Sequence, residues 1–184
     1  MDKIFVNRNN QPLKIALIGG ARTGKDTIAG YLGAVADFKR VAFGDALKEM
    51  LFTTFSDLPE YPKPRKEMIS FGQFCRTIDP LVWIKHVDNE VTKWQQFGYE
   101  NIVITDVRQE NEIDYCKQHG YTLVKVVASQ ETQIIRALAG EEILDVNNEL
   151  DIIAKEYAEY DYIIENNGSL LELYEQVDKI LQEG

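Results

Sequence analysis

The stretch Gly-Gly-Ala-Arg-Thr-Gly-Lys-Asp-Thr at residues 19–27 constrains the fold of this chain more than any other segment. It directly follows the apolar run 13–18, which is typical of a buried strand. Gly19 and Gly24 have four residues between them, so backbone N–H groups can turn inward around an anion without a Cβ atom in the way. Lys25 then opens a helix whose positive dipole end faces the same anion. The pattern predicts a strand, a phosphate-binding loop and a helix, in that order.

The loop also predicts where a nucleotide and its metal bind. We expect the ammonium group of Lys25 to reach the β- and γ-phosphates. Asp26 stands where the motif normally has a Ser or Thr that binds Mg²⁺, and Thr27 follows it. Asp26 could hold the metal directly or through water, and Thr27 could donate its hydroxyl to a phosphate, so both assignments stay open. The residues that we assign to nucleotide binding are Gly19, Ala21, Arg22, Thr23, Gly24, Lys25, Asp26 and Thr27.

Composition and charge limit the function classes. With 184 residues, 45% hydrophobic and 27% charged, we expect one globular domain over residues 1–184. The net charge of −10 would repel a nucleic acid, whereas Arg and Lys side chains in a cleft can still hold a small phosphorylated ligand. No segment resembles a membrane span or a signal peptide, so we expect a cytoplasmic protein that binds no membrane. Cys75 and Cys116 lack metal-ligand spacing and are interpreted as reduced thiols.

Strand-like and helical segments alternate along the chain. Because parallel strands need crossover helices, this alternation predicts an α/β fold: a parallel sheet of five strands, covered on both faces, that binds ligands at the carboxyl ends of its strands. The expected strands are residues 13–18, 40–43, 101–105, 121–127 and 161–164.

Three helices show clear sequence signals. The helix after the loop should bury Ile28, Leu32 and Val35. Asp79 and Pro80 are typical of an N-cap and first helical residue. The last helix should begin with a capping box of Ser169 and Glu172 and bury one apolar face. That face comprises Leu170, Leu173, Tyr174, Val177, Ile180 and Leu181. The Pro-rich basic segment 61–66 is expected to be a surface loop that could touch a substrate.

A second polar cluster follows the predicted strand 101–105. Asp106 stands at a strand end, where an acidic residue can help fix Mg²⁺ beside the phosphates; alternatively it caps the helix predicted at 109–118. Arg108 could hold a phosphate with two hydrogen bonds, or form a surface salt bridge with Glu110 or Glu112.

Four ordered blocks resemble a known family. They are Gly-Lys-Asp-Thr at 24–27, Ala-Phe-Gly-Asp-Ala-Leu-Lys at 42–48, Cys-Arg-x-Ile-Asp-Pro-x-Val-Trp-Ile at 75–84 and Ile-Thr-Asp-Val-Arg-x-x-Asn-Glu at 104–112. Together they resemble the deoxynucleoside monophosphate kinases of T-even-type bacteriophages. The resemblance implies a three-layer P-loop fold with an acceptor-binding helical insertion at about 44–98 and a small lid at about 130–158. It also implies ATP and Mg²⁺ as cofactors and transfer of the γ-phosphoryl group to a deoxynucleoside monophosphate.

The resemblance assigns Asp45, Lys48, Arg76 and Trp83, besides Arg108, to the acceptor nucleotide. An Arg can neutralise the acceptor phosphate, an aromatic ring can stack on the base, and an Asp can accept from a sugar hydroxyl or base amine. Each also has a structural alternative. Asp45 could be a helix N-cap and Lys48 a solvated charge, while Arg76 could pair with Asp79 and Trp83 could belong to the core.

The lid and the last turn complete the resemblance. Arg136 is the candidate that closes over the transferring phosphoryl group, and with Lys25 and Arg108 it forms our predicted catalytic set. The segment 140–149 is acidic and departs from the more basic lids of such kinases. The Asn-rich turn at 166–169 resembles the family's last turn, where backbone groups contact the donor adenine; we assign no residue role there.

Two other functions remain open from the sequence. The first is a P-loop kinase for another phosphorylated metabolite, of the dephospho-coenzyme A or phosphomevalonate type. The second is a nucleotide-dependent switch or NTP hydrolase, against which the chain lacks an Asn-Lys-x-Asp guanine reader and an Asp-x-x-Gly after the third strand. The expected partners are small nucleotides, and both a monomer and a homodimer remain open.

Overall fold

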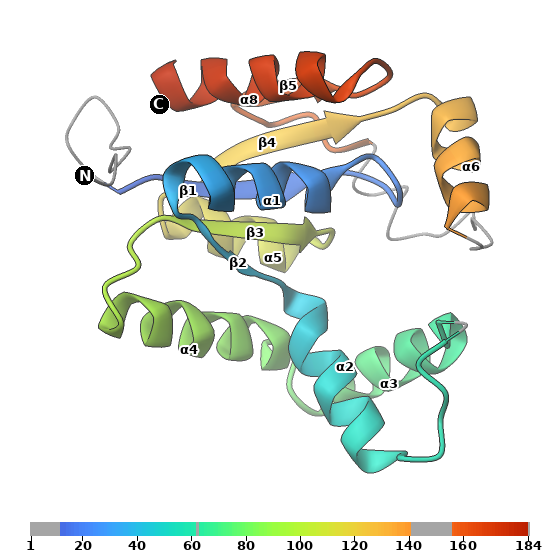
Figure 1. Cartoon of the computed structure of the whole chain (residues 1–184). Coiled ribbons are helices and arrows are strands. Elements are labelled where there is room, and N and C mark those ends of the chain that lie inside the picture. The colour runs from blue at the N-terminus through green and yellow to red at the C-terminus, as the bar shows by residue number, and fades with distance from the viewer. Residues whose placement is uncertain (1–11, 62, 141–155, 184) are drawn as a thin grey trace.

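A parallel sheet of five strands forms the centre of the fold in the computed structural model, which describes residues 12–61, 63–140 and 156–183 (Figure 1). The strands follow the order β2-β3-β1-β4-β5, and every neighbouring pair is parallel. In the central strand, Ala16 lies opposite Ile104 of β3 and Leu123 of β4. The strands are β1 (Lys14–Ile18), β2 (Lys39–Val41), β3 (Ile102–Val107), β4 (Thr122–Val127) and β5 (Tyr162–Glu165). The predicted α/β fold is confirmed.

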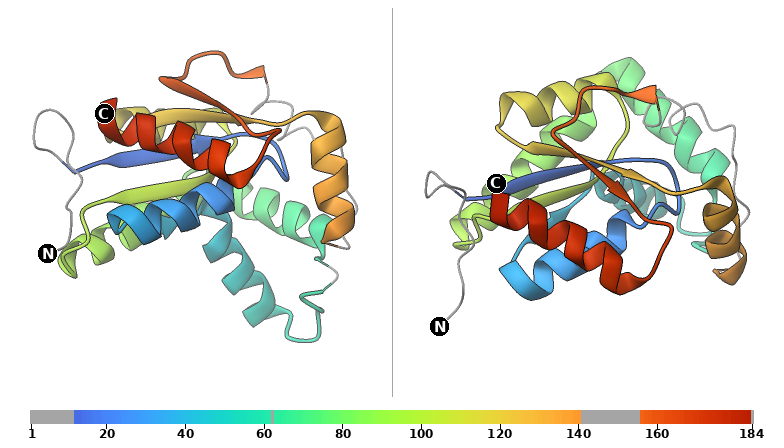
Figure 2. Two further views of the ribbon diagram at one scale, coloured as in Figure 1. Left: turned by 45° about the horizontal axis from the view of Figure 1, so that its top comes forward. Right: turned by 90° about the horizontal axis from the view of Figure 1, so that it is seen from above.

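Helices cover both faces of the sheet and give it two hydrophobic cores. On one face, α1 (Lys25–Ala36) and α8 (Leu170–Glu183) lie side by side and pack on Ile15, Leu17 and Val103 (Figure 2). On the other face, α2 (Phe43–Thr54), α4 (Val82–Gln96) and α5 (Glu110–Gln118) pack on Ala16 and Ile104, among others. Successive residues of β1 thus enter opposite cores, as the period of two in a strand requires.

The insertion between β2 and β3 consists of α2, α3 (Arg65–Ile78) and α4. Of these helices, α2 starts against the sheet with Phe43 and Leu47 and then leads away from it toward α3, beside the carboxyl ends of the strands, where α6 (Gln130–Ala139) also lies (Figure 1). The predicted surface loop at 61–66 is shorter than expected, because α3 already begins at Arg65. Of that segment, residue 62 lies outside the described part. Every helix in the described part of the chain is too short or too polar to span a membrane.

The structure departs from the predicted element boundaries at the starts of two helices, α2 and α4. The last predicted strand residue of β2, Phe43, instead begins α2, because the Asp106 carboxylate accepts hydrogen bonds from the backbone N–H groups of Phe43 and Gly44, both at 2.8 Å. Asp79 does not cap α4, which starts at Val82; its carboxylate accepts from the Leu81 N–H at 3.0 Å in the preceding turn. Side-chain hydrogen bonds therefore move both boundaries by a few residues.

The predicted capping box of α8 is confirmed, since the Glu172 carboxylate accepts from the Ser169 N–H at 2.7 Å and Ser169 Oγ accepts from the Glu172 N–H at 3.3 Å. The prediction that Val35 and Leu170 are buried is wrong. Val35 is 37% exposed and Leu170 is 60% exposed. On α1, the small Ala29 and Ala36 pack against the sheet beside Ile28 and Leu32 and turn Val35 outward. On α8, Leu170 is the first helical residue and lies at the edge of the cleft described below.

Candidate active site

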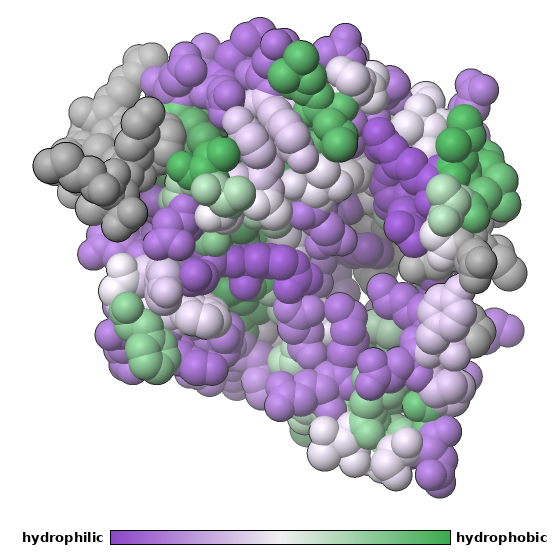
Figure 3. Space-filling view, in the orientation of Figure 1, coloured by the Kyte–Doolittle hydropathy of each residue, from purple (hydrophilic) through white to green (hydrophobic). Residues whose placement is uncertain are grey.

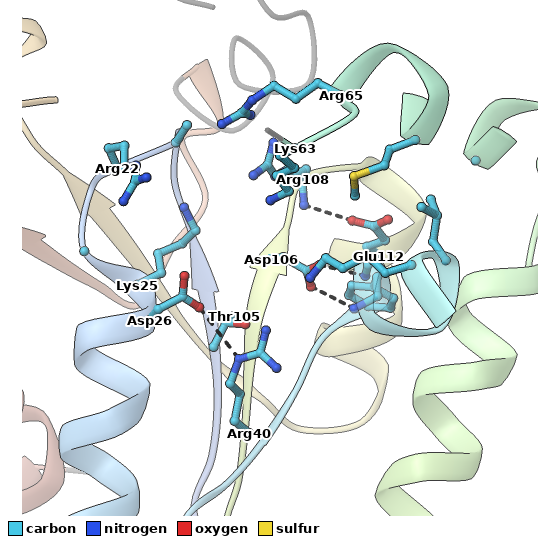
Figure 4. A pocket seen from close by; sticks show the side chains of 18 of the residues that line it. Arg22, Lys25, Asp26, Arg40, Lys63, Arg65, Thr105, Asp106, Arg108 and Glu112 are labelled. Carbon is cyan, nitrogen blue, oxygen red and sulfur yellow. Dashed lines mark hydrogen bonds and ion pairs between the residues drawn. The ribbon is translucent and has the colours of Figure 1, made fainter. Parts of the chain in front are cut away.

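A cleft of about 780 Å³ lies at the carboxyl ends of the strands (Figure 4). Its walls come from the loop before α1, from α2 and α3 of the insertion, from the end of β3, and from α6 and the start of α8. Around the middle of the face seen in Figure 3 the surface is mostly hydrophilic, while apolar residues gather over α6. Segments distant in sequence therefore meet at the sheet edge that the sequence analysis predicted as the ligand site.

The phosphate-binding loop is held in a shape that requires glycine. Gly24 has a φ of +103°, and a Cβ atom there would lie 2.2 Å from Nδ2 of Asn166. A Cβ atom at Gly19 would lie 2.3 Å from the carbonyl oxygen of Val126. Arg22 adopts a φ of 59°, which is uncommon for a residue with a side chain. The two glycines therefore allow the close backbone approach on which the predicted anion site depends.

Lys25 directs its ammonium group into this loop. Its Nζ donates to the carbonyl oxygens of Gly19 at 2.8 Å and Gly20 at 2.5 Å, and the residue is only 8% exposed. Thr23 is buried below the loop, where its hydroxyl donates to the Gly20 carbonyl at 3.0 Å. A positive charge is thus fixed at the centre of the loop, within reach of phosphates that the loop would surround.

Asp26 and Thr27 both line the cleft, so the geometry leaves both available to a nucleotide or its metal. Asp26 is exposed, and its Oδ1 lies 3.7 Å from Nε of Arg40. Within the residues that the structure describes, no three His, Cys, Asp or Glu side chains gather as a metal-binding group. The carboxylate of Asp26 and the hydroxyl group of Thr27 fit Mg²⁺, which proteins usually bind through one or two carboxylates together with waters and substrate phosphates.

Asp106 is placed in the cleft at the end of β3, but its structural role differs from the predicted alternative. It caps α2 rather than the helix that follows it, because each of its oxygens accepts one of the two N–H groups at the α2 start. A carboxylate can accept about four hydrogen bonds, so these two leave capacity for a metal-bound water. Asp106 thereby links the insertion to the sheet beside the phosphate-binding loop.

Arg76 and Arg108 meet at Glu112, a residue to which the sequence analysis gave no role of its own. Nη2 of Arg76 lies 3.3 Å from Oε1 of Glu112, whereas Asp79, its predicted alternative partner, pairs with Lys85. Oε2 of Glu112 accepts the backbone N–H groups of Arg108 at 2.9 Å and Gln109 at 3.1 Å. The signal in the sequence was the spacing of Gln109 and Glu112, which is that of a helix start.

The Glu112 carboxyl group has an unusual environment. Burial raises its pKa most, and the negative charge of Asp106 raises it further. The two backbone N–H groups and Arg76 act in the opposite direction, and the resulting pKa is about 7. Glu112 is 4% exposed yet contributes to the cleft lining. A carboxyl group that titrates near neutral pH therefore supports the arginine assigned to the acceptor.

Of the remaining residues predicted for the acceptor side, Lys48 and Trp83 belong to the described cleft lining, whereas Asp45 does not. Lys48 lines the cleft, but Asp45 lies outside its described lining and pairs with Arg40 at 2.6 Å and Lys48 at 3.1 Å. Burial alone would raise the pKa of Asp45, but these two cations outweigh it and lower the pKa. Trp83 is 2% exposed, and its Nε1 donates to the Gly72 carbonyl at 3.3 Å. Trp83 thus packs in the core and reaches the cleft only with part of its surface.

Arg136 connects α6 to the loop. Its Nη1 donates to the Arg22 carbonyl at 3.3 Å, and its Nη2 donates to the backbone and side-chain oxygens of Asn166, both at 3.1 Å. Asn166, which is 4% exposed, in turn donates to the Thr23 carbonyl at 2.8 Å. No local sequence pattern marks Asn166, because its partners Arg136 and Thr23 lie 30 and 143 residues away in the chain. The acidic lid segment 140–149 lies outside the described residues, apart from Gly140.

Comparison with known proteins decides the family. The family model for deoxynucleotide monophosphate kinase matches residues 65–177, which is more than half of the chain. The chain belongs to this family. A search of the curated proteins finds no significant match.

Solved structures agree with the kinase fold. TT1252 from Thermus thermophilus superposes with a TM-score of 0.61 at 15% identity, covering 94% of this chain and 98% of that one. Shikimate kinase from Acinetobacter baumannii, in complex with shikimate, gives 0.57 at 20% identity, covering 93% and 92%. A putative kinase from Chloroflexus aurantiacus gives 0.56 at 15% identity, covering 95% and 99%. At these identities the likeness concerns the fold alone.

As a deoxynucleotide monophosphate kinase, the protein transfers a phosphoryl group to a deoxynucleoside monophosphate. The predicted family and reaction class are thereby confirmed. The match gives no support to the alternative function as a nucleotide-dependent switch. The family match covers the insertion from α3 onward, β3, β4 and most of α8, but it begins after the phosphate-binding loop. Evidence for the loop comes from its own sequence and geometry.

Proposed function

We propose that this kinase transfers the γ-phosphoryl group of magnesium-bound ATP to the 5′-phosphate of a deoxynucleoside monophosphate, giving ADP and the diphosphate. The charge of the cleft is the observation that carries the proposal. Among the described residues, nine basic side chains line it against three acidic ones, Asp26, Asp106 and Glu112, although the whole chain carries a net charge of −10. The basic residues are Arg22, Lys25, Arg40, Lys48, Lys63, Arg65, Arg76, Arg108 and Arg136. Such a concentration of cations suits two phosphorylated ligands at once.

The two ends of the cleft differ in the way that a donor and an acceptor require. At one end, the glycine-rich loop, Arg136 and Asn166 surround the place for the donor phosphates. At the other end, Leu47 and Met68 of the insertion offer apolar surface for a base, and Arg76 and Lys63 offer charge for a phosphate. Lys63, Arg65 and Arg108 point into the cleft in Figure 4. This arrangement supports the insertion as the acceptor site.

The chemistry needs alignment and charge neutralisation more than covalent catalysis. The acceptor phosphate oxygen is already an anionic nucleophile, so an in-line attack on the γ-phosphorus forms the new P–O bond as the bond to ADP breaks. Lys25 and Arg136 stabilise the charge on the transferring group, and Arg76 and Arg108 orient the acceptor phosphate. Bound Mg²⁺ would neutralise charge on the β- and γ-oxygens, with Asp26 or Thr27 and Asp106 beside it.

An acceptor-dependence assay tests this function. ADP formation by the purified protein should require an added deoxynucleoside monophosphate, and a panel that includes ribonucleotides and other phosphorylated metabolites defines the acceptor. Rapid ADP formation without an acceptor would indicate a hydrolase instead.

The loop lysine provides the first prediction. Lys25→Ala should lower turnover by at least about 100-fold while the melting temperature stays close to that of the unaltered protein, because the ammonium group acts on phosphates. The matched control is Lys93→Ala, which removes an exposed ammonium group of α4 outside the described cleft lining and should leave turnover unchanged. Near-normal turnover of Lys25→Ala would contradict the proposed mechanism.

A further inference from the structure

Thr105 occupies a position in the cleft to which none of the motifs assigns a function. It is the residue before Asp106 in β3, it is 2% exposed, and it contributes to the cleft lining. Ile102 and Ile104 belong to the core under α2, α4 and α5, and Val103 belongs to the core under α1 and α8. The pairing of β1 with β3 shifts its register just after Ile104, so Thr105 lies where these two strands reach the start of the phosphate-binding loop.

The Thr105 hydroxyl group lacks a partner. Across the described residues, the buried side-chain oxygens and nitrogens without a hydrogen bond are Oγ1 of Thr105 and the hydroxyl oxygen of Tyr121. Buried polar groups are nearly always paired, because leaving one unpaired costs its full desolvation penalty. A Val side chain would fill the same space without that cost. The hydroxyl group of Thr105 is therefore a disadvantage to the protein alone, and a ligand in the cleft that Thr105 lines would be the source of a partner.

The neighbourhood of Thr105 indicates which ligand this is. Thr105 and Asp26 both line the cleft, and β3, which carries Thr105, pairs with β1, the strand that leads into the phosphate-binding loop and α1. Asp26 replaces the hydroxyl residue that normally ends the phosphate-binding motif. The acceptor-side pair Arg76 and Glu112 comes instead from α3 and α5, which pack on the other face of the sheet.

We propose that Thr105 is a donor-binding residue whose hydroxyl group hydrogen-bonds the magnesium–triphosphate group of ATP. The hydroxyl that the loop lacks at residue 26 is thus supplied from the neighbouring strand. The inference rests on the proposed function, since it assumes that magnesium-bound ATP occupies the loop. Its specific consequence is that the hydroxyl contributes to donor binding and not to acceptor binding or to folding.

The test compares three variants by thermal melting and by titration calorimetry. Thr105→Val removes the hydroxyl group at nearly constant volume, Thr105→Ser retains it, and Tyr121→Phe removes the other unpaired buried hydroxyl, which lies outside the described cleft lining. Without nucleotide, Thr105→Val and Tyr121→Phe should melt at the same temperature as the unaltered protein or higher. Thr105→Val should bind magnesium-ATP at least about 10-fold more weakly, as expected for one hydrogen bond to a charged group. Thr105→Ser should stay within about 3-fold, Tyr121→Phe should be unchanged, and all should bind the deoxynucleoside monophosphate equally.

The other outcomes would overturn either the proposed function or the inference about Thr105. If the unaltered protein does not take up magnesium-ATP, the proposed function itself fails. If it does and Thr105→Val binds magnesium-ATP as tightly, the inference about Thr105 is overturned while the function stands. A Thr105→Val protein that melts well below the unaltered protein, or does not fold, would show that the hydroxyl has a structural role and would also overturn the inference.

Discussion

Glu112 illustrates how one side chain can join a binding site to the fold. Its carboxylate pairs with Arg76 through one oxygen and fixes the backbone at Arg108 and Gln109 through the other. Glu112 therefore holds the Arg76 side chain and the backbone of Arg108, the two arginines that our proposal assigns to the acceptor phosphate. Its burial keeps those contacts away from competing water, and the same burial raises its pKa to about 7.

This pKa predicts a pH dependence of stability. The folded protein holds the Glu112 proton more tightly than the unfolded chain does, because the pKa rises from 4.5 to about 7 on folding. The contribution of Glu112 is therefore fully favourable below pH 4.5 and is lost as the pH rises through about 7, a difference of at most about 3 kcal/mol. Urea unfolding between these pH values should show this loss in the unaltered protein and not in Glu112→Gln. Parallel pH profiles of the two proteins would contradict the assigned pKa.

The loop glycine gives a second prediction for a single residue. Gly24→Ala should lower the free energy of unfolding by about 1–3 kcal/mol or more, because its φ is +103° and the new Cβ would meet the Asn166 amide. Gly30→Ala is the matched control, since it lies within α1 and its Cβ would meet no atom within 4 Å. That control should stabilise the protein by up to about 1 kcal/mol. Chemical denaturation of the two variants checks the opposite signs, and equal effects would contradict the account of the loop.

Among the elements, α6 has the clearest functional connection. It is tied to the loop by Arg136 and to the turn between β5 and α8 by the contacts of Arg136 with Asn166. The same guanidinium group that stabilises transferred charge in our proposal thus also positions the helix that carries it. These hydrogen bonds couple the position of α6 to the conformation of the loop.

This coupling predicts the effect of two substitutions in α6. Arg136→Ala should lower kcat by about 100-fold, and Arg136→Lys should recover only part of it, because a compact ammonium group lacks the planar fork that reaches Arg22 through one nitrogen and Asn166 through the other. Steady-state kinetics with varied ATP measures both. As a control, Ile135→Ala changes an exposed residue of the same helix and should have little effect. An unchanged kcat in Arg136→Ala would remove Arg136 from the catalytic set.

The features of these elements that could be predicted from the sequence are those that depend on residues close together in the chain. The loop, the five strands and the start of α8 depend on spacing within a few residues, and all were predictable. Asp106 as the cap of α2 and Asn166 as a support of the loop depend on contacts across 63 and 143 positions. Nothing in the local pattern of either residue indicates such a partner. The exposure of Val35 likewise depends on how closely α1 approaches the sheet, which its periodicity does not specify.

For the whole molecule, the distribution of charge is the main feature. The chain is acidic overall, yet the cleft is lined mainly by Arg and Lys. In our proposal, such a separation favours small phosphorylated ligands in the cleft over larger polyanions on the outer surface. Residues of both hydrophobic cores also line the cleft, Leu47 and Trp83 from one core and Leu173 from the other.

Salt should therefore weaken substrate binding more than it weakens the fold. Raising the ionic strength from about 0.05 M to about 0.5 M shortens the screening length to a few ångströms and should raise the KM of both nucleotides by about 3-fold or more. The melting temperature should change little over the same range. Steady-state kinetics and thermal melts in the same buffers compare the two, and KM values independent of salt would argue against electrostatic attraction by the cleft.

The most direct measurement of the central claim follows the phosphoryl group itself. The purified protein is incubated with Mg²⁺, ATP labelled at the γ-phosphate and each deoxynucleoside monophosphate in turn, and the products are separated. The account predicts that the label appears in a deoxynucleoside diphosphate, and that Lys25→Ala abolishes this transfer. Label that appears only as inorganic phosphate, or that stays in ATP with every acceptor, would contradict it.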